Sequence, residues 1–212
     1  METTAVHILD LPAPSLLIGS VLVVSLWGWL FKPVQTWMIL IPYRLRGGRE
    51  IHRLLTAGWV HGGLSHLFFN MLSLYFFAGQ TTQVLGSPRF LLLYLTAVVV
   101  AFIPSAIRHR NDPRWATLGA SGGVAAVMIS ALLLHPKLKI TLFFLPVPVP
   151  AAAFAALYLV YSLWHSYSEG DGVNHDAHFS GAVYGALLTY LFEPARVERS
   201  IRSLVRFAEA VR

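Results

Sequence analysis

The run WATLGASGGVAAVMISALLLHP, residues 115–136, contains no charged residue and is long enough for a helix that crosses a membrane. Near its start the segment GASG, residues 119–122, places a serine hydroxyl between glycines. A second uncharged run opens with AHFSG, residues 177–181. A candidate nucleophile, Ser121, and a candidate base, His178, therefore both lie at the start of a predicted membrane helix.

The composition is that of an integral membrane protein. Hydrophobic residues make up 56% of the 212-residue chain, charged residues make up 12%, and the mean hydropathy is +0.60. Uncharged stretches predict an all-α, polytopic bundle of six membrane helices in residues 1–193, with a first loop at about 32–63 and a basic tail at 194–212. These stretches are Leu11 to Phe31, Leu54 to Pro88, Phe90 to Ile107, Trp115 to Pro136, Ile140 to Ser168 and Ala177 to Phe192.

Basic residues predict how the bundle is oriented. By the positive-inside rule the tail is cytoplasmic, because it carries Arg196, Arg199, Arg202, Arg206 and Arg212. With six crossings the N-terminus is cytoplasmic too, and we expect a bacterial inner membrane. Three arginines in residues 108–114 lie on the supposed outer side and oppose this orientation.

The direction of the helices brings distant residues together. Helices two, four and six of such a bundle run the same way, so their N-terminal ends lie on one membrane face. His66, Ser121 and His178 are all near those ends. They can therefore meet at one depth, in a pocket that water enters.

The chemistry of Ser121 requires a partner. A serine hydroxyl is a poor nucleophile at neutral pH and needs a base within about 2.6–3.2 Å, a task that neutral imidazole suits, and we assign it to His178. Gly119 and Gly122 leave room for a substrate backbone, and the start of a helix offers free N–H groups to an oxyanion. The alternative is that the glycines only allow close helix packing.

The segment HGGLSHLFFN, residues 61–70, carries two further polar groups. His66 and Asn70 are four residues apart and share one helix face. Their donors could complete an oxyanion site with the Ser121 backbone N–H. Hydrogen bonding between helices explains the same pair equally well.

The last predicted helix carries a stripe of small residues. His178, Gly181 and Gly185 follow one another at i, i+3 and i+7, so the two glycines predict tight packing on a neighbouring helix. If that neighbour carries Ser121, the packing brings the imidazole to the hydroxyl.

The motifs HxxxxHxxxN, GASG and AHxxGxxxG, in this order and spacing, resemble those of rhomboid intramembrane serine proteases. The resemblance spans the whole six-helix core. It implies a dyad of Ser121 and His178 without a catalytic acid, oxyanion support from His66 and Asn70, and a nucleophile turn at residues 119–122. We expect single-pass transmembrane proteins and the lipid bilayer as partners, and no cofactor, metal or nucleic acid.

Two other regions invite comparison with the family. The first loop resembles a membrane-dipping segment that Arg53 fixes by hydrogen bonding, with apolar anchors at Trp37, Ile39, Leu40 and Ile41. His52 departs from the family pattern and is given no catalytic role. Ala125 stands where some members carry a tyrosine that packs on the base, which leaves the orientation of His178 open.

Asp171 and Asp176 lie close to His178 in the sequence. Because the family works with a dyad, we interpret them as solvated loop carboxylates.

The fifth stretch is interrupted by prolines, so we expect its regular helix from about Val149 to Tyr167. By resemblance, a loosely held helix here would admit substrate from the side. The prolines are Pro146, Pro148 and Pro150.

Other mechanisms fit the sequence less well. A membrane metalloprotease needs an HExxH motif and an aspartyl protease needs carboxylates within helices, and the sequence has neither. A Ser–Lys dyad is disfavoured because every lysine is peripheral to the apolar runs. A proton-coupled transporter would place polar residues at the bilayer midplane. The closest alternative is a catalytically inactive rhomboid-like protein that binds membrane clients, although such members typically lose the serine or the histidine.

Overall fold

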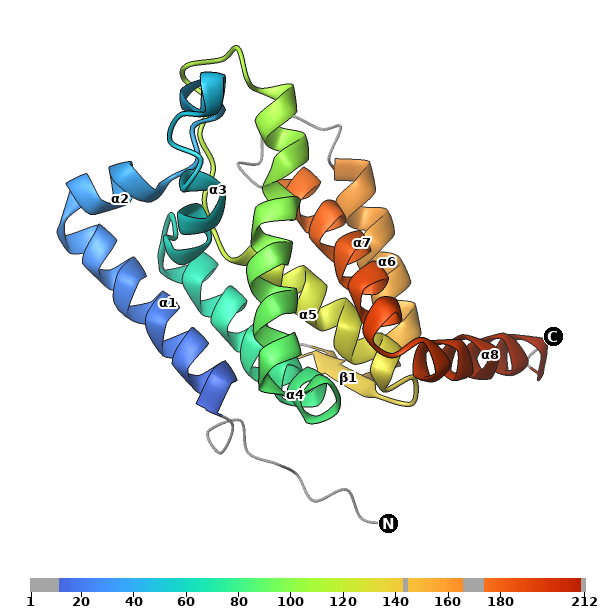
Figure 1. The fold of residues 1–212 in the computed structure, drawn as a ribbon. Helices are drawn as coiled ribbons and strands as arrows, with labels where there is room; N and C mark the ends of the chain where they lie inside the picture. Colours follow the sequence, from blue (N-terminus) through green and yellow to red (C-terminus); the bar gives the residue numbers. More distant parts are fainter. Residues whose placement is uncertain (1–11, 143–144, 166–173, 211–212) are drawn as a thin grey trace.

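The computed structural model describes residues 12–142, 145–165 and 174–210, and in these ranges the chain is mostly helical (Figure 1). The elements are α1 (Pro12–Leu30), α2 (Lys32–Met38), η2 (Pro42–Gly48), α3 (Arg53–Thr56), η3 (Ala57–Trp59), α4 (Leu64–Arg108), α5 (Ser121–Leu134), β1 (Lys139–Leu142), β2 (Leu145–Pro150), α6 (Ala151–His165), α7 (His175–Phe192) and α8 (Pro194–Ala210).

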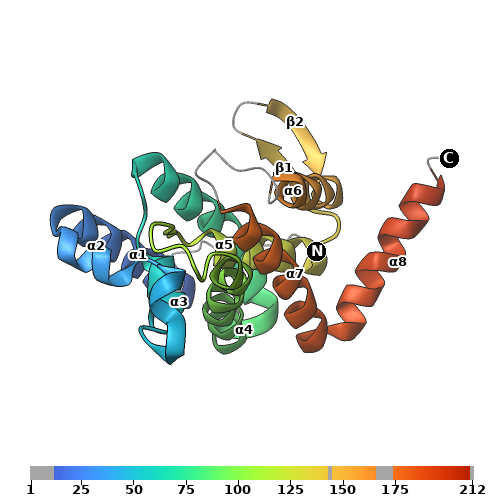
Figure 2. The same ribbon diagram turned by 90° about the horizontal axis from the view of Figure 1, so that it is seen from above.

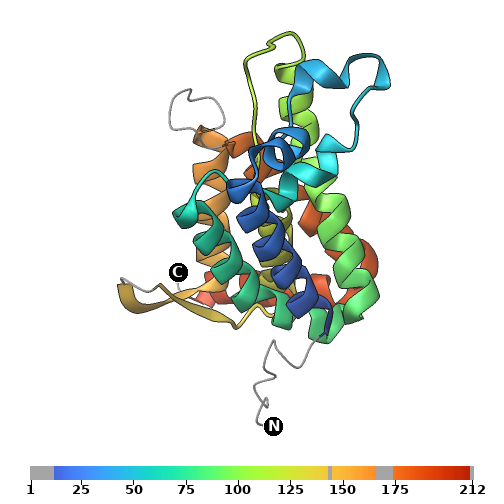
Figure 3. The same ribbon diagram turned by 90° about the vertical axis from the view of Figure 1, so that its left-hand side faces the viewer.

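The long helix α4 consists of two arms, residues 64–85 and 87–108, that run antiparallel, and α1 lies on one side of both arms (Figures 1 and 3). The chain reverses at Gly86, whose φ of 74° and ψ of 161° are not helical. A residue with a Cβ rarely adopts this conformation, and Pro88 then restarts the helix. The arms match the second and third stretches predicted from the sequence.

Apolar length supports insertion into a membrane for part of the bundle. Among the described residues, α1 and α4 are the two helices long and apolar enough to cross a membrane, and α5 is apolar but shorter. Many outward side chains are large and apolar, as expected of surfaces that face lipid. Examples are Leu16, Leu30, Phe69, Phe76, Leu157 and Trp164.

Helix α5 occupies the centre of the bundle. It lies between α4 and α7 (Figure 2), and every residue from Gly122 to Leu132 is buried. Its sequence makes this possible because glycine, alanine and short aliphatic residues cover all sides of the helix. The helix begins at Ser121, so the candidate nucleophile is the first residue of the most buried element.

The first loop is fixed by a buried arginine, as predicted. Arg53 donates hydrogen bonds to the carbonyl oxygens of Thr36 (2.8 Å) and Ile39 (2.7 Å) and pairs with Glu50. These bonds satisfy carbonyls at the end of α2 that have no partner within that helix. The expectation for Leu40 was wrong: it is fully buried and cannot contact lipid.

The proline-rich segment differs from the expectation. The segment is strand β2, which pairs antiparallel with β1, and α6 begins directly after it at Ala151, two residues from the expected start. A two-stranded hairpin accepts proline because one edge of each strand needs no partner. The expected end of the helix at Tyr167 lies outside the described residues.

Helix α8 turns sharply after α7 and projects sideways from the end of the bundle (Figures 1 and 2). Val197 and Ser200 are buried against the bundle, and Arg196 Nε donates to the carbonyl oxygen of Leu134 (3.3 Å). The basic tail predicted from the sequence is therefore helical through Ala210.

Candidate active site

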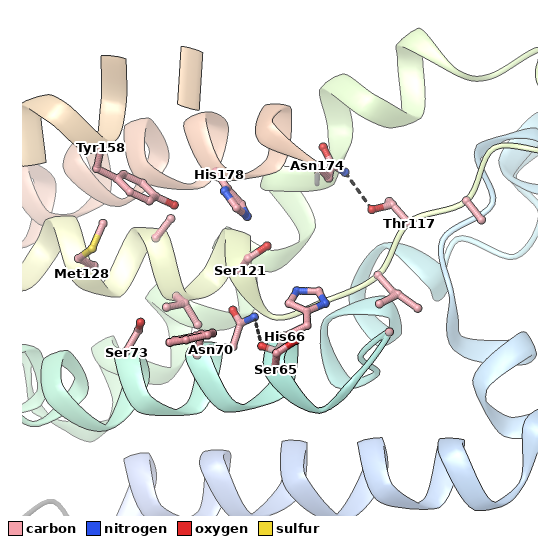
Figure 4. Close-up of a pocket in the computed structure, with 16 residues that line it drawn as sticks. Ser65, His66, Asn70, Ser73, Thr117, Ser121, Met128, Tyr158, Asn174 and His178 are labelled. Carbon is pink, nitrogen blue, oxygen red and sulfur yellow. Dashed lines mark hydrogen bonds between the residues drawn. The ribbon is translucent and has the colours of Figure 1, made fainter. Parts of the chain in front are cut away.

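One cavity of about 680 Å³ lies among the N-terminal ends of the first arm of α4, α5 and α7 (Figure 4). The four polar residues expected at a site, Ser121, His178, His66 and Asn70, all line it. Figure 4 shows the Ser121 hydroxyl beside the His178 ring, with His66 and Asn70 below them. The parallel direction of the three helices brings together residues that are more than one hundred positions apart.

The turn before Ser121 is fixed by backbone contacts. Gly119 donates its N–H to the carbonyl oxygen of Ala57 (2.8 Å), and Leu40 and Thr117 exchange hydrogen bonds of 3.0 Å. Gly119 has a φ of 121°, and a Cβ there would lie 2.6 Å from His66 Cε1. Glycine is therefore required both for the conformation of the turn and for the space that His66 occupies.

Glycines join α5 to α7 next to the two key residues. A Cβ on Gly181 would collide with the carbonyl oxygen of Gly122, and one on Gly185 would collide with the backbone of Ala126. A Cβ on Gly122 would in turn lie 3.3 Å from the carbonyl oxygen of Ala177. The neighbours of Ser121 and His178 thus touch backbone to backbone.

His66 and Asn70 lie on the facing arm of α4. Asn70 is buried, and its Nδ2 donates to the carbonyl oxygen of His66 (2.8 Å), which orients the amide beside the cavity. His66 is half-buried and packs under the Gly119 turn. Both residues therefore present nitrogen atoms to the same space as Ser121.

His61 is a buried residue to which the sequence assigned no role. Its Nε2 accepts the N–H of Ala120 (3.3 Å), and its Nδ1 lies 2.9 Å from Ser25 Oγ, which donates to the carbonyl oxygen of Trp59 (2.8 Å). Burial, assisted by the charge of His66, lowers the pKa of His61 to about 3. The neutral ring therefore links α1 to the residue just before Ser121.

Asn174 is a second residue that sequence reasoning missed. Its Oδ1 accepts the N–H of Ala177 (3.1 Å), which caps α7, and also accepts the Ser105 hydroxyl (2.9 Å). Its Nδ2 donates to Thr117 Oγ1 (3.2 Å), so one side chain connects α4, the turn before α5 and the start of α7. An asparagine directly before a helix is a readable capping signal.

Asp176 is not solvated, contrary to expectation. Its carboxylate lies 2.9 Å from Arg108 Nη1, and its side chain is 10% exposed. The pair joins the end of α4 to the first turn of α7 and neutralises one of the arginines of the 108–114 loop. Asp171 lies outside the described residues.

An aromatic ring from α6 completes the wall of the cavity. Tyr158 stacks on His178 with ring centroids 6.2 Å apart and an angle of 20° between the planes. Ala125, one turn along α5 from Ser121, also lines the cavity but offers only a methyl group. No group of three histidine or acidic side chains that could hold a metal ion occurs in the described ranges.

Comparisons with known proteins agree on one family. A family model described as "Rhomboid domain" matches residues 48–195. "RHOMBOID-like protein 12, mitochondrial" of Arabidopsis thaliana is 32% identical over 160 residues, which are 67% of this chain and 46% of that protein. "Putative rhomboid protease YdcA" of Bacillus subtilis is 30% identical over 153 residues, 67% of each chain.

A third relative, "Inactive RHOMBOID-like protein 8" of Arabidopsis thaliana, is 34% identical over 88 residues, which are 42% of this chain and 25% of that protein. This chain thus matches less than half the length of either plant relative.

Proposed function

Because this chain belongs to the rhomboid family, we propose that it is an intramembrane serine endopeptidase that cleaves transmembrane helices of single-pass membrane proteins. The family is membrane-embedded, and its members are usually serine proteases. The observation that carries the proposal is the meeting of Ser121 and His178 at one cavity, where the glycine contacts between α5 and α7 hold their backbones together.

In the proposed reaction His178 takes the proton from Ser121 Oγ as the oxygen attacks the scissile carbonyl carbon. The tetrahedral intermediate collapses when His178 gives that proton to the leaving amine, and an acyl-serine ester remains. Water then attacks the ester, again with His178 as base, and releases the second product. The cavity gives water a place beside the ester.

The oxyanion would be bound by three groups. As the first residue of α5, Ser121 has a backbone N–H that no carbonyl of its own helix can accept. The His66 ring and the Asn70 amide lie across the cavity, and Asn70 would exchange its bond to the His66 carbonyl for one to the oxyanion. Loss of one such donor typically costs about 2.7–4 kcal/mol of barrier lowering.

We further propose six crossings: α1, the two arms of α4, α5, α6 and α7. Their order and alternating directions support this count, as do their outward apolar side chains. The basic helix α8 supports a cytoplasmic C-terminus. Two of the plant relatives are named mitochondrial and chloroplastic, and another relative comes from a bacterium, so the relatives do not identify one membrane. We propose the bacterial inner membrane as the location of this chain.

The substrate would be a helix with small or helix-weakening residues near the level of the cavity. A scissile amide must leave its helical hydrogen bonds before attack, and in a bilayer this is costly unless water or the protein replaces them. Helix α6 is exposed and lies at the outer side of the bundle (Figure 2), and we propose that the substrate helix reaches Ser121 from this side.

One alternative function has a specific observation in its favour. The relative named inactive shares 34% identity over 88 residues, which supports a catalytically inactive protein. Retention of both Ser121 and His178 supports the protease.

Cleavage of a single-pass test substrate in detergent tests the proposal. We expect cleavage by the wild type, loss of cleavage in Ser121→Ala and His178→Ala, and wild-type rates in Ser130→Ala. Ser130 lies on the same helix, and its buried hydroxyl has no hydrogen-bond partner in the described structure. A folded wild type that neither cleaves nor reacts with a fluorophosphonate would favour the client-binding alternative, and an active Ser121→Ala would exclude the proposed nucleophile.

A further inference from the structure

Helix α6 is the most exposed helix of the bundle core. None of its side chains whose burial the structure describes is buried, and Leu157, Val160 and Trp164 are more than 60% exposed. Its inner side is formed by half-buried side chains, including Phe154 and Tyr158, that pack against the core. The position of this helix therefore depends on a few side chains on one face.

The two tyrosines of α6 contact the two histidines of α7. Tyr158 stacks on His178 at 6.2 Å, and Tyr161 meets the ring of His175 edge to face at 5.5 Å. The two tyrosines are three residues apart on α6 and the two histidines are three residues apart on α7, so the four rings form two successive contacts along the α6–α7 boundary. Figure 4 shows Tyr158 close to His178 at the wall of the cavity.

The side chains of α5 that lie near His178 are small. The nearest turns of α5 present Gly122 and Ala125, which carry no group able to stack on an imidazole. The glycine contacts fix the backbone of α7, whereas the His178 ring contacts two other rings, Tyr158 of α6 and, edge to face at 5.6 Å, His175 of its own helix. The ring of Tyr158 is therefore the contact from α6 that limits how the imidazole can turn.

We propose that Tyr158 is the positioning residue for the general base, so that the alignment of His178 depends on how α6 is seated. This inference rests on the proposed protease function. Displacement of α6 removes the ring and leaves the base misaligned, and return of α6 restores it. An aromatic pair of ordinary strength corresponds to a roughly two- to tenfold change in rate.

Two activity measurements distinguish a positioning role of Tyr158 from direct contact between Tyr158 and the substrate. Fluorophosphonate labelling of Ser121 needs an aligned base but no transmembrane substrate, whereas cleavage of the test substrate gives kcat and KM. We expect Tyr158→Leu to lower the labelling rate and kcat by the same two- to tenfold, with KM unchanged. Tyr158→Phe retains the ring and should keep the wild-type rates, as should the control Leu157→Ala on the outer face of α6.

A second variant tests the dependence on α6 itself. Phe154→Ala loosens the inner face one turn away from Tyr158. We expect it to slow labelling in the wild-type background and to have no further effect in Tyr158→Leu, because the base is then already released. Tyr158→Met fills the same space without a ring and replaces Tyr158→Leu if that variant unfolds.

The outcomes distinguish the two proposals. Wild-type labelling by a folded Tyr158→Leu protein, or an effect on KM alone, would overturn the positioning role and leave the protease intact. Additive losses from Phe154→Ala and Tyr158→Leu would overturn the link to α6. A folded wild type that neither labels nor cleaves would overturn the protease function itself.

Discussion

Helices α5 and α6 both pack against α7, and they do so by different means. At the α5–α7 contact, a Cβ on Gly181 would collide with the backbone of Gly122, and a Cβ on Gly185 would collide with the backbone of Ala126. At the α6–α7 contact, the rings of tyrosines and histidines meet at 5.5–6.2 Å, and the outer face of α6 is exposed. One boundary is backbone on backbone, and the other is side chain on side chain.

The difference separates the two halves of the proposed dyad. A backbone contact without side chains has no rotamers to change, so the position of Ser121 relative to α7 is rigid. A contact through rings on an exposed helix can open without disturbing the core. The nucleophile is therefore fixed by the fold, whereas the base can respond to whatever moves α6.

The largest effect should come from adding a methyl group to the rigid boundary. Gly181→Ala places a Cβ against the carbonyl oxygen of Gly122, so α5 and α7 must move apart. We expect a destabilisation of about 1–3 kcal/mol in thermal unfolding and loss of most Ser121 labelling, because a small displacement of the dyad is enough to stop the reaction.

Gly79→Ala is the matched control. Gly79 is buried in the first arm of α4, and no atom lies within 4 Å of a Cβ built there. The added methyl should stabilise the helix by about 0.5–1 kcal/mol. Equal effects of the two substitutions would show that the α5–α7 contact is not unusually tight.

The next effect concerns His61, which accepts the N–H of Ala120 just before α5, and it depends on pH. Burial lowers the pKa of His61 from its ordinary value of 6.5 to about 3, so below pH 6.5 the unfolded chain binds a proton that the folded chain does not. Stability should therefore fall between pH 6.5 and 3, by at most about 1.4 kcal/mol per pH unit.

His61→Gln removes the titration and can keep both hydrogen bonds. We expect its unfolding temperature in detergent to fall less steeply with acid than that of the wild type. Parallel curves for the two proteins would mean that other groups cause the acid sensitivity.

A smaller effect is expected at the start of α7, which both boundaries share. Asn174→Ala removes the cap of α7 and the bonds to Ser105 and Thr117, and should cost about 1 kcal/mol. Asn174→Asp keeps the cap but cannot donate to Thr117. If thermal unfolding shows the aspartate variant to be as unstable as the alanine variant, the bond to Thr117 matters more than the cap.

The smallest effect should occur in the first loop, away from both boundaries. The hydrogen bond from Arg53 holds the pKa of Glu50 below its usual value. The stabilisation of the fold by this pair is therefore fully present above the usual pKa of a glutamate and is lost as the pH falls through the lowered pKa. Because Glu50 is exposed and Arg53 keeps its two carbonyl partners, Glu50→Gln should leave Ser121 labelling unchanged. A clear loss of labelling would show that this loop controls the site.

Much of the fold was readable because each prediction rested on local chemistry. Two uncharged stretches, Leu54 to Pro88 and Phe90 to Ile107, predicted the arms of α4, and Ser121 was expected at the head of a helix, where α5 begins. The predicted hydrogen bonding of Arg53 is confirmed. The prolines were misread because a hairpin and a helix entrance tolerate the same residues, and only pairing with β1 decides between them.

For the candidate site too, some features were predicted from the sequence and others are seen only in the structure. The four polar residues were found from their spacing, and the structure brings them to one cavity. The capping role of Asn174 was available from its place before a helix, but its bonds to Ser105 and Thr117 were not. Asp176 looked like a loop carboxylate because its partner Arg108 is 68 positions away in the chain.

The sequence by itself determined the class of this protein, its apolar helices and the residues that carry the proposed chemistry, because hydropathy, motif spacing and glycine placement are local properties. Only the tertiary structure decided which helix supplies the ring against His178, that Leu40 is buried, and that His61 supports the turn before Ser121. Those facts depend on which surfaces meet when the helices pack, and no periodicity within a single segment records its neighbour.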